Sequence, residues 1–350
     1  MREPRPSVRA MRPYSPPTGN RVNMLRLDFN ERTAPQPPQL LAAIRAAITD
    51  DSLSMYPDYD AALPAAARLL GRPAESIVLT NGTDEAIQLL VTTYLSPGDR
   101  LVIIEPSYAM YRFYAEAAGV EVDAVQCSVD DDLAIPVDEI IRRLPGAAAL
   151  FIANPNNPTG AALSLDTLTR IAEAAGDTLV LVDEAYVEFH GVTALSLLDR
   201  FDNVVVSRTF SKAYGLAGLR CGCLAAPEPT TRWLRTAQSP YSVNAVAAAA
   251  LAAVAALQPD ETFDRYVREV IEARTYTAAA LERLGLRVFP SAANFLLFDA
   301  GEGADRMLRH LADRGILIRD RRHEIPRCLR VSIGTPEQMH RFVTEMERCT

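Results

Sequence analysis

The segment from Ser207 to Arg220 brings together residue types that could bind an aldehyde and a phosphate. Lys212 follows the hydroxyl residues Thr209 and Ser211. A lysine amine can form a Schiff base with an aldehyde. Hydroxyl groups bind phosphate, and an arginine such as Arg220 does so in a fixed, forked geometry. An aldehyde and a phosphate on one small molecule describe pyridoxal phosphate. A lone lysine beside small residues is usually a surface residue, so the rest of the chain must decide between the two interpretations.

The residues that would position this lysine form a series of short apolar runs with helical segments between most of them. The runs are rich in Val, Ile and Leu without polar alternation, as is typical of strands buried on both faces. Two of the helical segments are Asp84–Leu95 and Leu165–Ala175. This alternation predicts an α/β fold with a mostly parallel central sheet and helices on both faces. The predicted strands are Ile77–Thr80, Leu101–Glu105, Val120–Val125, Ala148–Ile152, Leu179–Asp183, Val204–Ser207 and Cys221–Ala225.

Polar, glycine-bearing or aromatic clusters follow five of these strands. In open α/β sheets, ligands bind outside the carboxyl ends of the strands. Each cluster alone could be turn chemistry, but five at one edge of one sheet favour a binding site. The clusters are Asn81–Glu85, Pro106–Tyr108, Asn154–Gly160, Asp183–Tyr186 and Arg208–Lys212.

Two of the clusters supply candidate anchors for the two ends of the cofactor. Gly82 and Thr83 open a predicted helix, where free backbone N–H groups bind phosphate, although Thr83 could equally be an ordinary cap. Asp183 ends an apolar strand, where burial of a carboxylate without a partner costs free energy. A protonated pyridine nitrogen would be such a partner and would withdraw electrons from the substrate. A helix cap or a salt bridge is the structural alternative for Asp183.

Three further residues could hold the ring between these anchors. Tyr186 and the amide of Asn157 could donate hydrogen bonds to the phenolic oxygen of the ring. Tyr108 could stack on a flat cofactor. Each of them alone is more often structural, in core packing or a hydrogen bond.

Two arginines near the C-terminus could bind the substrate. Arg330 lies inside an apolar strand, and a buried arginine needs an anion. A substrate carboxylate or phosphate would provide one through a bidentate contact. Arg319 ends the preceding strand and could add a second cation, or could form a salt bridge with Asp320 or another carboxylate. Tyr56 lies before the first strand and cannot be placed in the site by these arguments.

Composition narrows the class of protein. The chain has 350 residues, of which 49% are hydrophobic and 23% are charged. Its net charge of −8 argues against nucleic-acid and anionic-membrane partners. Five scattered cysteines without a C-x-x-C pair are typical of reduced thiols, and four distant histidines predict no metal site. The apolar run 245–257 is too short to span a bilayer, and the N-terminus lacks a secretory h-region. A cytoplasmic location is expected.

The chain divides into three predicted parts. Residues 1–35 contain many prolines and no periodicity, and are expected to form an arm that lies across another surface. Residues 36–244 would form the large cofactor-binding domain. Residues 245–350 would form a smaller α/β domain with two strand regions, at about 286–298 and 316–333.

These residues together resemble the fold-type I, class I/II pyridoxal-phosphate aminotransferases almost from end to end, and within them the histidinol-phosphate aminotransferases. The lysine segment and the Asn-Pro-Thr-Gly segment are the most specific parts of the match. The segments that carry it are Arg12–Tyr14, Leu27–Glu31, Tyr56–Asp58, Asn81–Glu85, Asn154–Gly160, Asp183–Tyr186, Arg208–Gly222, Pro240–Asn244 and Leu329–Thr335.

The resemblance implies roles for individual residues and a homodimer with shared active sites. Lys212 would be the Schiff-base lysine and the proton shuttle, and Asp183 would pair with the pyridinium nitrogen. Arg330, with Arg319 and Asn30 nearby, would bind the substrate. The other cofactor contacts implied are ring contacts from Tyr108, Asn157 and Tyr186, and phosphate contacts from Gly82, Thr83, Thr209, Ser211, Arg220 and the other subunit's Tyr56. The implied reaction is amino transfer between histidinol phosphate and 2-oxoglutarate in histidine biosynthesis.

One departure from the family pattern leaves other functions open. The family usually continues Asn-Glu with Asn-Pro-aromatic-Gly, whereas here Asn30-Glu31 is followed by Arg32-Thr33-Ala34-Pro35. Arg32 could add charge to the substrate pocket, which motivates an aminotransferase for aromatic or other amino acids as an alternative. A decarboxylase of a phosphorylated amino acid on the same scaffold is a second. A nucleotide-dependent dehydrogenase lacks support, because Gly215, Gly218 and Gly222 do not form G-x-G-x-x-G, and a cofactor-binding regulator would need a DNA-binding region that this acidic chain does not offer.

Overall fold

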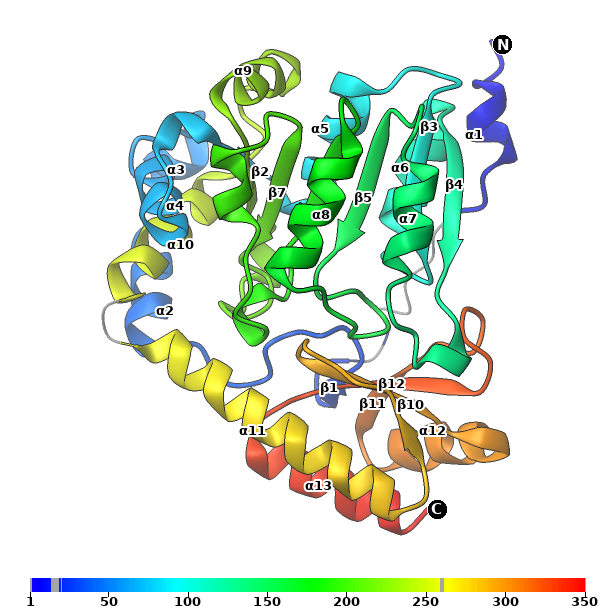
Figure 1. The fold of residues 1–350 in the computed structure, drawn as a ribbon. Coiled ribbons are helices and arrows are strands. Elements are labelled where there is room, and N and C mark those ends of the chain that lie inside the picture. Colours follow the sequence, from blue (N-terminus) through cyan, green and yellow to red (C-terminus); the bar gives the residue numbers. More distant parts are fainter. Residues whose placement is uncertain (1, 14–18, 20, 259–260, 350) are drawn as a thin grey trace.

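A computed structural model describes residues 2–13, 19, 21–258 and 261–349. Tyr14, part of one segment of the family resemblance, and several other positions of the predicted arm lie outside the described residues. Two sheets organise the chain (Figure 1). The large sheet lies above the small one in this view, and helices surround both.

The large sheet has seven strands in the order β2-β8-β7-β6-β5-β3-β4. Adjacent strands in this sheet are parallel except for β8, which runs antiparallel to β2 and β7. The prediction of a mostly parallel sheet is therefore confirmed. The strands are β2 (Ile77–Thr80), β3 (Arg100–Glu105), β4 (Glu121–Gln126), β5 (Ala149–Ala153), β6 (Leu179–Asp183), β7 (Val204–Thr209) and β8 (Gly222–Ala225).

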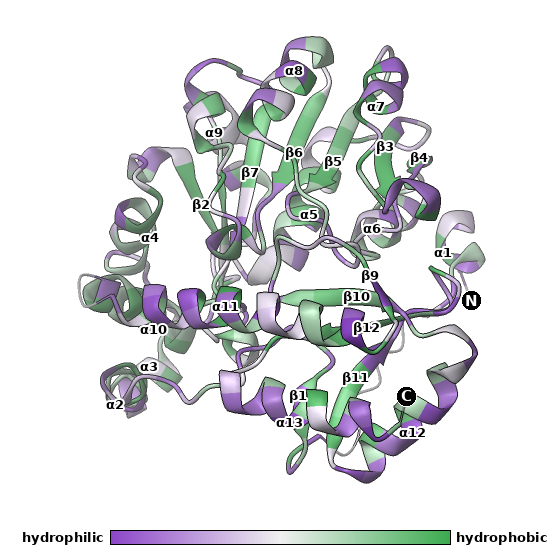
Figure 2. Cartoon of the chain, turned by 60° about the horizontal axis from the view of Figure 1, so that its bottom comes forward, coloured by the Kyte–Doolittle hydropathy of each residue, from purple (hydrophilic) through white to green (hydrophobic). Residues whose placement is uncertain are grey.

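Helices cover both faces of the large sheet because its strands are apolar on both sides. Successive side chains of a strand point to opposite faces, so in β3 Val102 and Ile104 join one core cluster while Leu101 and Ile103 join the other. Figure 2 shows these strands as mainly hydrophobic. One face is covered by α4 (Ala62–Leu70), α7 (Val137–Arg143) and α8 (Leu165–Ala175), and the other by α5 (Gly82–Tyr94), α6 (Met110–Ala118) and α9 (Glu228–Ala237).

The small sheet has the order β1-β11-β12-β10-β9, and its first strand comes from the predicted N-terminal arm. Leu25–Leu27 pairs in parallel with Ile316–Ile318, so this part of the segment 1–35 is built into the C-terminal sheet. The strands are β1 (Leu25–Leu27), β9 (Arg287–Val288), β10 (Phe295–Asp299), β11 (Ile316–Asp320) and β12 (Cys328–Ser332), and the helices beside them are α11 (Thr262–Arg283), α12 (Ala304–Asp313) and α13 (Pro336–Glu347).

The remaining helices lie at the edges of this arrangement. The apolar run that is too short to span a bilayer forms the helix α10 (Ala245–Leu257), which packs against α2 (Pro38–Ala46) and α4. Short helices are α1 (Pro6–Ala10) and α3 (Asp50–Ser54). None of the helices in the described ranges has the length and apolar character needed to cross a membrane. The domain boundary at 244/245 stays a prediction.

Candidate active site

A cavity of about 380 Å³ lies where the carboxyl ends of the parallel strands face the small sheet. Its walls come from loops after β2, β3, β5, β6 and β7, from residues 29–31 after β1, and from β11 and β12. The fold thus brings distant segments to one place, as expected for an open α/β sheet. The predicted site residues that line the cavity are Asn30, Thr83, Tyr108, Asn157, Asp183, Tyr186, Thr209, Ser211, Lys212, Arg220, Arg319 and Arg330.

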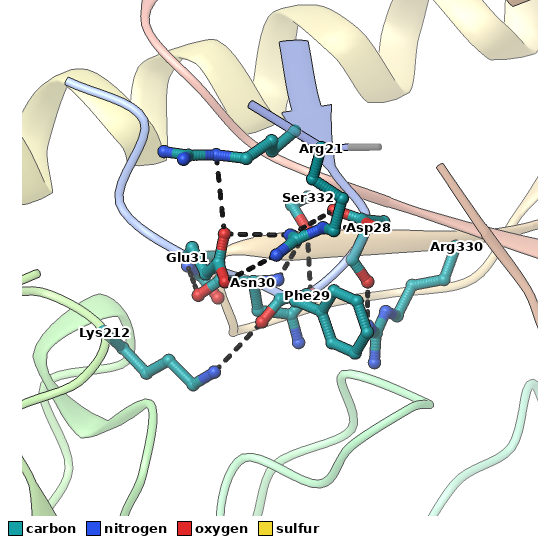
Figure 3. Close-up of polar contacts among 10 residues, drawn as sticks. Arg21, Asp28, Phe29, Asn30, Glu31, Lys212, Arg330 and Ser332 are labelled. Carbon is teal, nitrogen blue, oxygen red and sulfur yellow. Dashed lines mark hydrogen bonds and ion pairs between the residues drawn. The ribbon is translucent and has the colours of Figure 1, made fainter. Parts of the chain in front are cut away.

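Lys212 lies in the loop that follows β7, with its amine directed at the chain that leaves β1. The Nζ atom donates a hydrogen bond to the carbonyl oxygen of Phe29 at 3.1 Å (Figure 3). Lys212 is also the only lysine in the chain. The side chain whose amine could bond an aldehyde in this protein is therefore held at the cavity by a contact that only the folded chain creates.

Asp183 ends β6 with a side chain that is almost completely buried. Its two carboxylate oxygens accept hydrogen bonds from the hydroxyls of Tyr111 at 2.7 Å and Ser207 at 2.8 Å. Burial raises the pKa of this carboxyl group, and the two hydroxyl donors oppose that rise. No cation pairs with it among the described residues, so the ionised form needs a positive group from the cavity side.

Further amide and hydroxyl groups line the same cavity as Asp183. The hydroxyl of Tyr186 accepts a hydrogen bond from the amide of Asn30 at 3.0 Å, which leaves its own proton available to a ligand. Asn157 accepts from Arg330 through its carbonyl oxygen, so its NH₂ group is the part that can donate. Asn30 has a positive φ of 56° and is held by Ser332 and Asn294. Its side chain is therefore used to position Tyr186.

The N-terminus of α5 forms one end of the cavity. Gly82 has a φ of +75°, and a Cβ atom there would lie 2.6 Å from the Nη2 atom of Arg220, so a side chain at this position would displace the Arg220 guanidinium. The buried hydroxyl of Thr83 has no partner in the described part of the chain. Arg220 pairs with Asp84 at 3.0 Å, and the hydroxyl of Tyr108 donates to the other oxygen of Asp84 at 2.6 Å. Helix N–H groups, a hydroxyl and a guanidinium together can hold a phosphate.

The opposite end of the cavity is positively charged. Arg330 is buried, donates to the carbonyl oxygen of Asp28 at 2.7 Å, and has a buried Nε without a hydrogen-bond partner in the described structure. Burial lowers the pKa of Arg330, and the nearby charges of Arg321 and Arg319 lower it further. Glu324 compensates part of this charge through an ion pair with Arg321 at 2.6 Å. An anion from solution would relieve the remaining repulsion.

Arg319 does not make the salt bridge with Asp320 that the sequence left open. Asp320 instead pairs with Arg322 at 2.7 Å. The guanidinium of Arg319 lies 5.0 Å from the ring centre of Phe29 and lines the cavity. It is therefore placed beside Arg330 as a second cation.

Tyr56 lies outside the cavity of the single chain. Its side chain is 77% exposed and stacks on Tyr241 with the ring centres 4.3 Å apart. The contact with phosphate across subunits stays a prediction. Arg32 also does not line the cavity of the single chain, and its effect on the charge of the substrate pocket stays a prediction.

Comparison with known proteins assigns the chain to a family. Residues 22–346 match the family described as aminotransferase class I and II. The chain belongs to this family. Histidinol-phosphate aminotransferases from Symbiobacterium thermophilum and Roseiflexus castenholzii are each 39% identical to it, over 98% and 95% of this chain and 97% and 94% of theirs. A crystal structure of histidinol-phosphate aminotransferase from Sinorhizobium meliloti in complex with pyridoxal-5'-phosphate superposes with a TM-score of 0.88 at 25% identity, covering 99% of this chain and 96% of that one.

In this member of the family, sequence reasoning missed several residues that shape the site. Tyr111 follows the predicted Tyr108 by three residues and lies in the first turn of α6, which begins at Met110, so its closeness in sequence to a predicted site residue could have found it. Ser207 and Asp84 flank residues that were predicted and could have been included with them. Arg321 gave no sequence signal that separates it from other arginines, because its place depends on the packing of the connection after β11.

Proposed function

We propose that this protein is a pyridoxal-phosphate-dependent aminotransferase that transfers an amino group between histidinol phosphate and 2-oxoglutarate. The observation that carries the proposal is that the chain's single lysine and the buried Asp183, which has no cationic partner among the described residues, line the same cavity. A lysine amine and a carboxylate that line one cavity match the aldehyde and the pyridine nitrogen of this cofactor. The relatives named above support the choice of reaction.

The buried polar groups of the cavity fit the cofactor. The unpartnered Thr83 hydroxyl, the α5 amides and Arg220 would hold its phosphate, with Thr209 and Ser211 beside them. Asp183 would hold the ring nitrogen, Tyr186 and Asn157 would hold the ring oxygen, and Tyr108 would lie against the ring. When bound, the cofactor supplies an aldehyde that bonds covalently to amines and a protonated ring that takes up electron density.

The chain's own residues would carry out the proton movements and the positioning. The Nζ of Lys212 would take a proton from the substrate's Cα as a general base and, as a general acid, would return it to the carbon that was the cofactor's aldehyde carbon. Asp183 keeps the ring nitrogen protonated because its buried negative charge stabilises a neighbouring positive one. Arg330 orients the substrate through the bidentate contacts that a guanidinium makes with carboxylate or phosphate.

The positive end of the cavity supports two anionic substrates that bind in turn. Glutamate and histidinol phosphate share an amino group but differ in the anion beyond it. Arg330 and Arg319, with Arg321 beside them, offer enough donors for a dianionic phosphate as well as for a carboxylate. Arg32, which motivated the alternative of aromatic substrates, does not line the single-chain cavity and so does not support that alternative there.

We also propose a cytoplasmic homodimer. Exposed apolar side chains follow one another closely at Ile48, Leu53, Met55 and Tyr56, and Tyr241 stacks on the last of them. Such a group of exposed side chains is typical of a protein interface. All five cysteines are free and buried, as suits a reducing compartment. Light scattering of the wild-type protein and of Tyr56→Ala tests the dimer. A homodimer predicts a measured mass of twice the chain mass for the wild type.

A substrate panel tests the proposed reaction. Purified protein is mixed with pyridoxal phosphate, and the visible spectrum is followed after addition of glutamate, histidinol phosphate, phenylalanine or phosphothreonine. We expect the first two to change the spectrum and to exchange amino groups, and Lys212→Ala to do neither. Preference for phenylalanine over histidinol phosphate, or release of carbon dioxide without a keto acid, would overturn the proposed substrate.

A further inference from the structure

The loop that carries Lys212 is held along its length by the segment 29–36. Lys212 donates to the carbonyl of Phe29 at 3.1 Å. The Nη1 atom of Arg32 donates to the carbonyl of Ala213 at 3.0 Å. The side-chain amide of Gln36 donates to the carbonyls of the next two residues, Tyr214 at 3.3 Å and Gly215 at 2.8 Å. Four consecutive residues of the loop, 212 to 215, are thus each bonded to a segment about 180 positions away in sequence.

The two segments also pack so closely that they leave no room for a side chain. Gly215 has a φ of +71°, and a Cβ atom there would lie 2.6 Å from the Cδ atom of Arg32 and would also meet the amide of Gln36. The loop therefore depends on glycine for this approach, and any movement of Arg32 changes the space available to the loop.

Arg32 is anchored from its other side by α11. Its guanidinium lies 3.8 Å from the ring centre of Tyr266 and 6.0 Å from that of Phe263. Burial lowers its pKa, and Tyr266 and Glu269 partly oppose this. No carboxylate pairs with Arg32 among the described residues. A half-buried arginine that stacks on an aromatic ring and bonds a backbone carbonyl is suited to fixing a geometry rather than to binding a solvent-exposed partner.

We infer that Arg32, together with Gln36, is a positioning residue that fixes the lysine loop and so places the amine of Lys212 for proton transfer. The inference rests on the proposed function. Long side chains such as lysine lose rotamer freedom when they are fixed, and a displacement of about 1 Å in a reacting group can cost about a hundredfold in rate. Arg32, where the chain departs from the family pattern, would then serve to hold the lysine loop in place.

A matched pair of variants tests the inference. Arg32→Met keeps much of the length and the packing on Tyr266 but cannot donate to Ala213. Arg274→Met is the control, because Arg274 is also a partly buried arginine with a lowered pKa that donates to one backbone carbonyl, that of Ala293, away from the lysine loop. Gln36→Leu removes the two neighbouring hydrogen bonds and serves if Arg32→Met does not fold.

The first measurement uses the apoprotein, so it does not depend on the reaction. Because the chain has one lysine, protein grown with [ε-¹³C]lysine shows a single lysine Cε resonance. We expect the Arg32 or Gln36 variant to shift or split this resonance, and Arg274→Met to leave it in place. The second measurement uses the holoenzyme, in which we expect kcat to fall about tenfold or more while the KM for glutamate changes by less than about threefold.

The outcomes separate this inference from the proposed reaction. A wild type that transfers no amino group would overturn the reaction, while the resonance would still decide the position of Lys212. An unchanged resonance and kcat in the Arg32 variant, or in Gln36→Leu if Arg32→Met is unfolded, would overturn the positioning role. The same would follow if Arg274→Met moved the resonance equally, since the effect would then be one of general packing.

Discussion

Replacing Gly82 by alanine is expected to weaken cofactor binding by displacing Arg220. Gly82 adopts a φ of +75°, in which an alanine costs about 1–2 kcal/mol. The added Cβ would also lie 2.6 Å from the Nη2 atom of Arg220, so the guanidinium must move. A hydrogen bond to a charged group contributes about 1.5–3 kcal/mol. The Arg220 side chain is 41% exposed, so solvent screening favours the lower end of that range, which corresponds to a Kd for pyridoxal phosphate that is about tenfold higher.

Gly71 provides the matched control for this substitution. It has a similar φ of +62° at the C-terminus of α4, but a Cβ atom there would have nothing within 4 Å. Gly71→Ala therefore carries the backbone cost without the clash. We expect both variants to lower the thermal midpoint of the apoprotein, and only Gly82→Ala to raise the Kd measured by fluorescence titration. A wild-type Kd in Gly82→Ala, or an equal loss in Gly71→Ala, would refute the reasoning that links Gly82 to Arg220.

Three further substitutions test the electrostatics of the buried groups. Arg330→Met should raise the KM for anionic substrates about a hundredfold. It should not lower the thermal midpoint, because it removes a buried charge whose pKa is already lowered. A KM near the wild-type value would contradict the substrate role of Arg330. Tyr111→Phe removes a donor to Asp183, so kcat should fall about threefold to tenfold, with Tyr114→Phe as the control in kinetic assays. Burial raises the pKa of Glu188 to about 7 from 4.5, with Arg208 opposing the rise. Since the folded state then holds this proton more tightly than the unfolded state, stability should fall as pH rises from about 4.5 to about 7. Urea unfolding should show a smaller decline for Glu188→Gln across this range, and an unchanged slope would be evidence against the raised pKa.

The fold was largely predictable because its signals are local. The apolar runs lacked polar alternation, and this property follows directly from burial on both faces of a parallel sheet. The strand β1 was missed, because three residues in a proline-rich segment carry little periodicity and pair only with the distant β11. Its presence in the small sheet is what brings residues 29–31 to the cavity.

The sequence by itself determined which residues could do chemistry and at which edge of the sheet they would meet. A single lysine after an apolar strand, and an aspartate at the end of another, are positions that parallel strands carry to one edge whatever the rest of the chain does. The tertiary structure decided which groups form hydrogen bonds with these residues. The carbonyl of Phe29 that receives Lys212, the hydroxyls that hold Asp183, and the direction of Arg32 toward the lysine loop all depend on packing between distant segments. Hydrogen bonds act over about 3 Å, and no spacing along the chain fixes which distant groups come that close.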